Sequence, residues 1–229
     1  PVIATSIYTI MDKIMLGNMI DMNAVGIYEN ADKIKNVLMG FITALGTVML
    51  PKITNLITNG EKKLAEKYLY KSLKYILLVS FAIGIGLAAI SKEFVVVFFG
   101  NEFKNSYNVM IVLSISMIFI AWANVIRTQK LIPEKLDKIY ISSTVIGAIV
   151  NFIFNIVFIK YFNVIGAAIA TLLAESCIAV YQTIAIRKKL DIHNIKYVVK
   201  NILVYLIASI IMFAIIRIIG EYLKASWLF

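Results

Sequence analysis

Seven stretches of this chain carry almost no charge, and most are long enough to form a helix across a lipid bilayer. Crossing the hydrocarbon takes about 20 mostly apolar residues. The stretches predict helices over residues 1–18, 27–51, 74–91, 106–127, 139–159, 163–186 and 198–219. Strands of a transmembrane barrel would alternate apolar and polar residues, and the run 76–79 (ILLV) does not. We therefore predict an all-α membrane protein, a polytopic bundle of about seven helices.

Composition supports this class and removes several others. The chain is 61% hydrophobic and only 16% charged, which is too apolar for a soluble domain. Cys177 is the only cysteine and His193 the only histidine, so neither a disulfide scaffold nor a histidine-rich zinc site is expected. No Gly-rich phosphate loop or nucleophile elbow occurs. We expect no enzyme activity, no cofactor and no resident metal.

The basic residues fall in alternate loops. The loops 52–74, 127–138 and 187–200 hold 15 of the 23 Lys and Arg residues, whereas the intervening loops and the C-terminal segment hold 5. Because cytoplasmic loops of membrane proteins are enriched in Lys and Arg, these three loops are predicted to be cytoplasmic. An anionic inner leaflet accounts for the net charge of +10, so no nucleic-acid partner is expected.

Local signals refine the helix ends. Pro51 and Pro133 are expected to close the second and fourth helices. Residues 61–74 have the spacing of an amphipathic helix, which we expect to lie flat on the inner leaflet. The chain starts at Pro1 inside an apolar stretch, so residues 1–229 are expected to form one transmembrane lobe of a longer polypeptide.

Charged residues inside predicted spans are concentrated in the first two helices. They lie on either side of the expected 17–26 connection, and because burying a charge in a membrane is costly they mark a candidate polar cavity. The alternative is that they neutralise one another at the interface. The members are Asp12, Lys13, Glu29, Asp32, Lys33 and Lys35.

Other polar residues in the spans are few, and each has two interpretations. Asn151 and Asn155, one helical turn apart, either contact a substrate or hydrogen-bond a neighbouring helix. Glu175 is the only charge in its helix and is either a site for a coupling ion or a neutral hydrogen-bond donor. Arg127, which follows Asn124, either contacts a phosphate or extends to the interface.

Several motifs together resemble one family. They are DKIMLG at 12–17, VGIY at 25–28, ADKI at 31–34, PKI at 51–53, NFIFN at 151–155 and GAAIAT at 166–171, followed by Glu175. In this order and spacing they resemble the second half of the Wzx-type polysaccharide flippases. Those proteins belong to the multidrug/oligosaccharidyl-lipid/polysaccharide (MOP) exporter superfamily.

The resemblance implies a fold, a substrate and a location. This chain would be the C-terminal lobe of a two-lobed transporter with a central cavity lined by its first two helices, Tyr28 included. Such transporters move undecaprenyl-pyrophosphate-linked oligosaccharides from the inner to the outer leaflet of a bacterial cell membrane for surface polysaccharide synthesis. An H⁺ or Na⁺ gradient would drive alternating access. Glu175 or the pair Asp12 and Asp32 would couple the ion, and a polysaccharide polymerase and export machinery would be partners.

Three rivals remain from the sequence. A multidrug exporter of the same superfamily would use the acidic residues to bind organic cations, and a lipid II flippase would carry a similar polyprenyl cargo. A membrane polymerase or ligase is disfavoured, because the predicted outward loops are too short for an acceptor site.

Overall fold

The computed structural model describes the backbone of residues 2–187 and 192–226, and these residues are nearly all helical. The long helices are α1 (Val2–Met19), α2 (Met22–Thr58), α3 (Lys62–Phe99), α4 (Ser106–Ile126), α5 (Asp137–Ile186) and α6 (Ile192–Ser226). A short 3₁₀ helix, η1 (Asn101–Phe103), and a π-helical turn, η2 (Arg127–Leu131), flank α4. No strand occurs in the described ranges, so the all-α prediction is confirmed.

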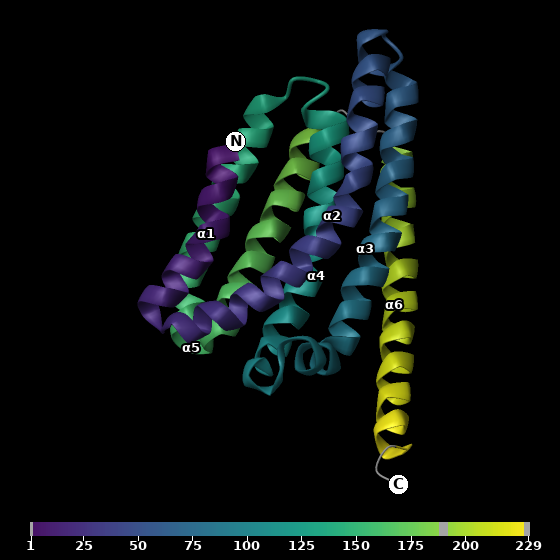
Figure 1. Cartoon of the computed structure of the whole chain (residues 1–229). Helices are drawn as coiled ribbons and strands as arrows, with labels where there is room; N and C mark the ends of the chain where they lie inside the picture. The colour runs from purple at the N-terminus through teal and green to yellow at the C-terminus, as the bar shows by residue number, and fades with distance from the viewer. Residues whose placement is uncertain (1, 188–191, 227–229) are drawn as a thin grey trace.

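The longest helix, α5, is two antiparallel arms. Its backbone leaves the helical region at Asn163, where φ is 52° and ψ is −134°, and the chain then returns beside its own first arm (Figure 1). Gly166 permits the close approach, because a Cβ there would lie 2.1 Å from the carbonyl oxygen of Phe158. Counting the two arms separately gives the seven helices expected from the sequence.

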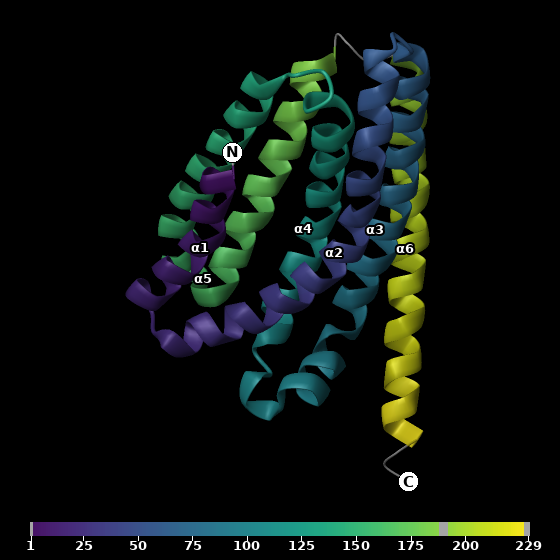
Figure 2. The ribbon, with the colours of Figure 1, turned by 45° about the horizontal axis from the view of Figure 1, so that its top comes forward.

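The helices form one bundle with α4 at its centre. α1 packs along α5, α2 crosses α4, and α6 lies against α3 on the far side, an arrangement seen from two directions in Figures 1 and 2. Fully buried Leu77, Leu113 and Met117 fill the interface between α3 and α4. Close packing there also uses Gly84, whose absent Cβ would lie 2.7 Å from the Ser114 carbonyl oxygen.

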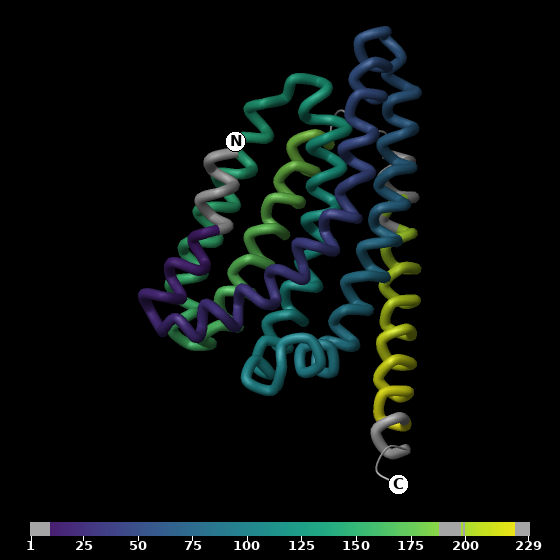
Figure 3. Tube along the Cα trace, in the orientation of Figure 1, coloured from purple at the N-terminus to yellow at the C-terminus, as the bar shows by residue number. Residues whose placement is uncertain are grey.

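The connections separate into two ends. The α2–α3 and α4–α5 turns and the start of α6 lie at the upper end in Figure 1, and the trace in Figure 3 shows the α1–α2, α3–α4 and Asn163 turns at the other. The three lysine-rich segments therefore share one end, as their alternation predicts; residues 188–191 of the third lie outside the described residues.

Five ranges are long and apolar enough to cross a membrane. They are Met22–Thr58, Lys62–Phe99, Ser106–Leu131, Asp137–Ile186 and Lys200–Tyr222. The protein is thus an integral membrane protein built from helices.

Several expected boundaries are wrong. α2 begins at Met22 rather than near residue 27, because Asp21 caps it by accepting a 2.7 Å hydrogen bond from the Ala24 amide. α2 also continues past Pro51 to Thr58, since the lost amide bond and the crowded carbonyl that a proline causes are tolerated in a helix held by its neighbours. The third lysine-rich segment is partly helical, because α6 begins at Ile192.

The expected interfacial helix at 61–74 is also not separate. It continues α3 without a break, and its apolar face packs inside the protein: Ala65, Leu69 and Leu73 are buried, as is Ile53 on the end of α2. The amphipathic spacing reflects contact between two extended helices, so the segment does not lie flat on a membrane.

Candidate functional site

Asp12 is the centre of a buried polar site between α1, α2 and both arms of α5. Its Oδ1 accepts hydrogen bonds from Nδ2 of Asn151 at 2.9 Å and of Asn155 at 2.6 Å. Its Oδ2 accepts bonds from the Tyr28 hydroxyl at 2.6 Å and the Thr171 hydroxyl at 2.7 Å. All five side chains are buried, so the carboxylate is solvated by four neutral donors instead of water.

Local sequence explains how this site forms. Asn151 and Asn155 are four residues apart on the first arm of α5 and therefore share one helical face. The close contact at Gly166 brings Thr171 of the second arm to the same place. The two hydroxyls of Tyr28 and Thr171 also lie 3.1 Å apart, which ties α2 to α5.

The chemistry of this site is that of a buried carboxylate held by hydrogen-bond donors. Both amides turn an N–H group toward Asp12, and the Oδ1 of Asn155 is buried without a hydrogen-bond partner. Such a carboxylate can take up a proton, and rotation of the amides would turn their oxygens, which are ligands for hard cations, toward it. Among the side chains that the structure describes, no three His, Cys, Asp or Glu residues lie close enough together to hold a metal ion.

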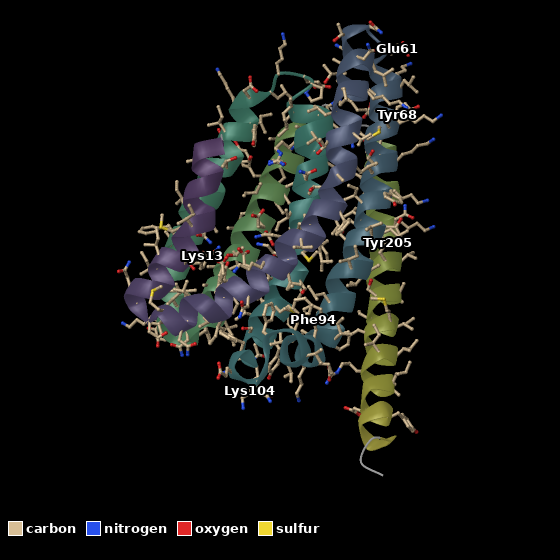
Figure 4. The ribbon with its side chains drawn as sticks, viewed as in Figure 1. Lys13, Glu61, Tyr68, Phe94, Lys104 and Tyr205 are labelled. Atoms are coloured by element: carbon tan, nitrogen blue, oxygen red, sulfur yellow. The ribbon has the colours of Figure 1, made fainter. Side chains whose placement is uncertain are left out.

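A second cluster pairs the remaining charges of α1 and α2. Lys13 forms an ion pair with Glu29 and lies 3.4 Å from Asp32, and Lys35 contacts Asp32 at 2.6 Å. Lys33 is 3.7 Å from Glu29. Figure 4 places Lys13 between α1 and α2, well inside the length of the bundle. These residues are the charge cluster: Lys13, Glu29, Asp32, Lys33 and Lys35.

The three lysines of the charge cluster differ in how far their side chains are exposed. The side chain of Lys33 is 64% exposed and that of Lys13 is 26% exposed, whereas Lys35 is 9% exposed and held by Asp32. Asp32 also accepts a 3.1 Å bond from Asn36. Lys13 and Lys33 can therefore reach an incoming group, while Lys35 neutralises a buried carboxylate.

A third site contains Asn124, Arg127 and Glu175. They line a cavity of about 170 Å³ between α4, η2 and the arms of α5, together with Tyr140, Thr144 and Gln182. The guanidinium of Arg127 lies 5.7 Å from the centre of the Tyr140 ring, close enough for a cation–π contact. This pocket lies toward the lysine-rich end of the bundle, because Arg127 follows α4 directly.

The residues that were expected to line one cavity thus belong to three separate sites. The structure joins Asp12 with Tyr28, Asn151 and Asn155, and it gathers the charge cluster as expected from the spacing. Asp12 is bonded to neutral groups rather than to a lysine, so mutual neutralisation describes the charge cluster but not Asp12. Asp12 and Asp32 likewise have different partners.

One member of the Asp12 site was missed. Thr171 had a detectable signal, because it ends the GAAIAT motif and lies one turn before Glu175. Its partner in α1 could not be found from that signal, since the helix it contacts is 159 residues away in the chain.

Apolar membrane-crossing helices that enclose a buried carboxylate and a charge cluster are typical of a polytopic membrane transporter. The chain belongs to the family described as lipid II flippase MurJ, whose model matches residues 2–229. The expectation of a transporter family instead of an enzyme family is confirmed.

One relative is also named as a flippase. A protein of Haloferax volcanii named "Probable low-salt glycan biosynthesis flippase Agl15" is 27% identical over 167 residues, which are 73% of this chain and 35% of that protein. This chain therefore spans about a third of the length of that relative.

Two solved structures share the fold. The inward closed conformation of lipid II flippase MurJ matches with a TM-score of 0.76 at 18% identity, over 99% of this chain and 52% of that one. A MOP superfamily transporter from Pyrococcus furiosus, whose binding pocket is described as reversed in polarity, matches with a TM-score of 0.70 at 21% identity, over 91% and 48%. These two structures confirm the fold that the sequence motifs implied.

Proposed function

We propose that this chain is the C-terminal lobe of a flippase that moves undecaprenyl-pyrophosphate-linked oligosaccharides from the inner to the outer leaflet for surface polysaccharide synthesis. The observation that carries the proposal is the charge cluster on α1 and α2 in a lobe whose other membrane-crossing helices are largely apolar. A diphosphate and its sugars cannot cross hydrocarbon unaided, because desolvating their polar groups is prohibitive. A polar face between two lobes, with the lipid tail left in the bilayer, removes that barrier.

Lys13 and Lys33 are the proposed contacts for the diphosphate. Both are accessible, and both are paired with Glu29. A diphosphate carries more charge than one carboxylate, so it would displace Glu29 from the two lysines. Glu29 then acts as an internal competitor that keeps substrate binding reversible.

Asp12 is the proposed coupling site, in preference to Glu175. Its carboxylate is buried, accepts hydrogen bonds from amide N–H and hydroxyl groups, and lies next in sequence to Lys13. An H⁺ or Na⁺ at Asp12 would drive alternating access by favouring one arrangement of α1 against α2 and α5. Asn124 and Arg127, in the separate pocket with Glu175, are proposed to contact the sugars near the lysine-rich end.

The proposal includes the membrane in which the protein lies, its orientation and its partners. We place it in a bacterial inner membrane with the lysine-rich end in the cytoplasm, beside anionic headgroups. A polysaccharide polymerase and the export machinery would receive the flipped product.

The test uses cells that lack the full-length protein. Loss of surface polysaccharide together with accumulation of undecaprenyl-linked repeat units on the cytoplasmic side supports a flippase. Complementation with Lys13→Gln/Lys33→Gln should fail, whereas Lys92→Gln/Lys104→Gln, which removes the same charge from exposed positions near the α3–α4 turn, should succeed. Normal polysaccharide with raised sensitivity to cationic drugs would overturn the proposal in favour of a multidrug exporter.

A second candidate is a lipid II flippase, which is favoured by the family model over residues 2–229. Its cargo has the same lipid and diphosphate but a different sugar. In the same depleted cells, accumulation of inward-facing lipid II with arrested wall synthesis, and unchanged repeat-unit levels, would select this candidate.

A further inference from the structure

The extended ends of α2 and α3 carry a row of lysines on one face. Lys63, Lys67, Lys71 and Lys74 are spaced i, i+4, i+8 and i+11 on α3, which places them within about 80° of its circumference at 3.6 residues per turn. All four are exposed. These residues are called the lysine row.

The opposite face of this segment is fixed by packing. Ala65 and Leu69 are buried, Ile53 of α2 is fully buried, and the Lys52 ammonium lies 4.0 Å from the centre of the Tyr68 ring. The lysine row therefore stands on a packed helical hairpin. Figure 4 shows nitrogen-tipped side chains leaving this part of α3, near Tyr68, away from the bundle.

The row has few acids of its own. Glu66 is half-buried on a neighbouring face and accepts a 3.2 Å bond from the Tyr70 hydroxyl. Lys67 instead has like charges at both i−4 and i+4, an arrangement that disfavours a helix. Four aligned cations that repel one another make a surface complementary to aligned carboxylates.

The distance of the row from the hydrocarbon edge favours a protein over a lipid surface as its partner. The apolar stretch of α3 begins near Tyr75, so Lys74 lies at the edge of the hydrocarbon. At a rise of 1.5 Å per residue, Lys67 and Lys63 lie about 10 and 16 Å further along the axis. Headgroups occupy only about 5–8 Å on each side of a bilayer. The headgroups of a flat membrane thus reach Lys71 and Lys74 but not Lys63 and Lys67.

We propose that the lysine row docks an acidic helical segment of a partner protein at this face of the membrane. A helix with Asp or Glu at every fourth residue, laid along α3, presents carboxylates to Lys63 and Lys67 above the headgroups and to Lys71 beside them. The proposal is independent of the transported substrate, because the row is exposed on α3, whereas the charge cluster lies on α1 and α2.

The test uses the full-length protein in phosphatidylcholine nanodiscs. The probe is a fluorescent alanine-rich helical peptide with glutamates at i, i+4, i+8 and i+11, compared by anisotropy with a peptide of equal composition whose glutamates are spread around all faces. The variant is Lys63→Gln/Lys67→Gln/Lys71→Gln. The control, Lys92→Gln/Lys104→Gln/Lys160→Gln, removes three exposed charges from the opposite end.

The aligned peptide should bind the wild type more tightly than the scattered one, and about tenfold more tightly than the row variant, the loss expected from three exposed ion pairs. The control should bind like the wild type. Equal binding of both peptides, or equal loss in both variants, would show only non-specific attraction and overturn the proposal. It would also be overturned if nanodiscs containing anionic lipid abolished peptide binding, because lipid would then occupy the row.

Discussion

Replacing Asp12 by leucine tests whether the buried carboxylate holds α1 to the bundle. The substitution removes the acceptor of four hydrogen bonds, from Tyr28, Asn151, Asn155 and Thr171. Two of those donors can find another partner at once. The Tyr28 and Thr171 hydroxyls are already 3.1 Å apart, and Nδ2 of Asn155 is 3.1 Å from Oδ1 of Asn151.

The other two donors are left buried without an acceptor. Each orphaned donor costs about 1–3 kcal/mol, so Asp12→Leu should lower the free energy of unfolding by about 2–6 kcal/mol. The Tm should fall together with the free energy of unfolding. The double variant Asp12→Leu/Thr171→Val exchanges one unpaired hydroxyl for another, because Tyr28 then loses its remaining partner, so its Tm should stay close to that of Asp12→Leu.

Thermal unfolding of the detergent-solubilised full-length protein, followed by thiol-reactive or intrinsic fluorescence, measures these shifts. Asp137→Asn is the control, because Asp137 is exposed. A Tm for Asp12→Leu equal to that of the wild type would show that the cost of burying the carboxylate cancels its four bonds. Strictly additive effects in the double variant would show that Thr171 is not energetically linked to Asp12.

Three further substitutions test the packing. Gly166→Ala should prevent the two arms of α5 from closing on the Phe158 carbonyl, and retained expression and Tm would contradict the observed contact. Thr183→Val removes the acceptor of the 2.9 Å bond from the Trp122 indole and should cost about 1 kcal/mol, seen as a small fall in Tm; no fall would mean that the bond is replaced. Asn163→Gly relieves a non-glycine residue at φ 52° and should raise the Tm, whereas a lower Tm would show that the asparagine side chain stabilises the turn.

The sequence was sufficient to predict the helices and to predict which residues share a helical face. Charge and apolarity alternate along the chain at intervals set by the bilayer, which is why the spans and the lysine-rich end could be predicted. The spacing of Asn151 and Asn155 likewise predicted one polar stripe. These features depend only on local periodicity.

Partners across the bundle could not be predicted in the same way. Asp12 and Lys13 are adjacent in sequence, and only the packing of α5 decides that Asp12 faces its amides while Lys13 faces Glu29. The amphipathic spacing of residues 61–74 fits a lipid surface and a protein surface equally, because a helix buries an apolar face as well against one as against the other. The extension of α2 past Pro51 supplied the protein surface that the sequence did not reveal.

The neighbouring positions of Asp12 and Lys13 make α1 a mechanical link. Tyr28 and Glu29 are also consecutive, so α1 and α2 are joined by two parallel bridges, one from Asp12 to Tyr28 and one from Lys13 to Glu29. A rotation of α1 that moves Asp12 relative to the α5 amides also moves Lys13 relative to Glu29. If a ligand at one bridge favours one rotation of α1, thermodynamic linkage requires a ligand at the other bridge to change the affinity at the first by the same factor.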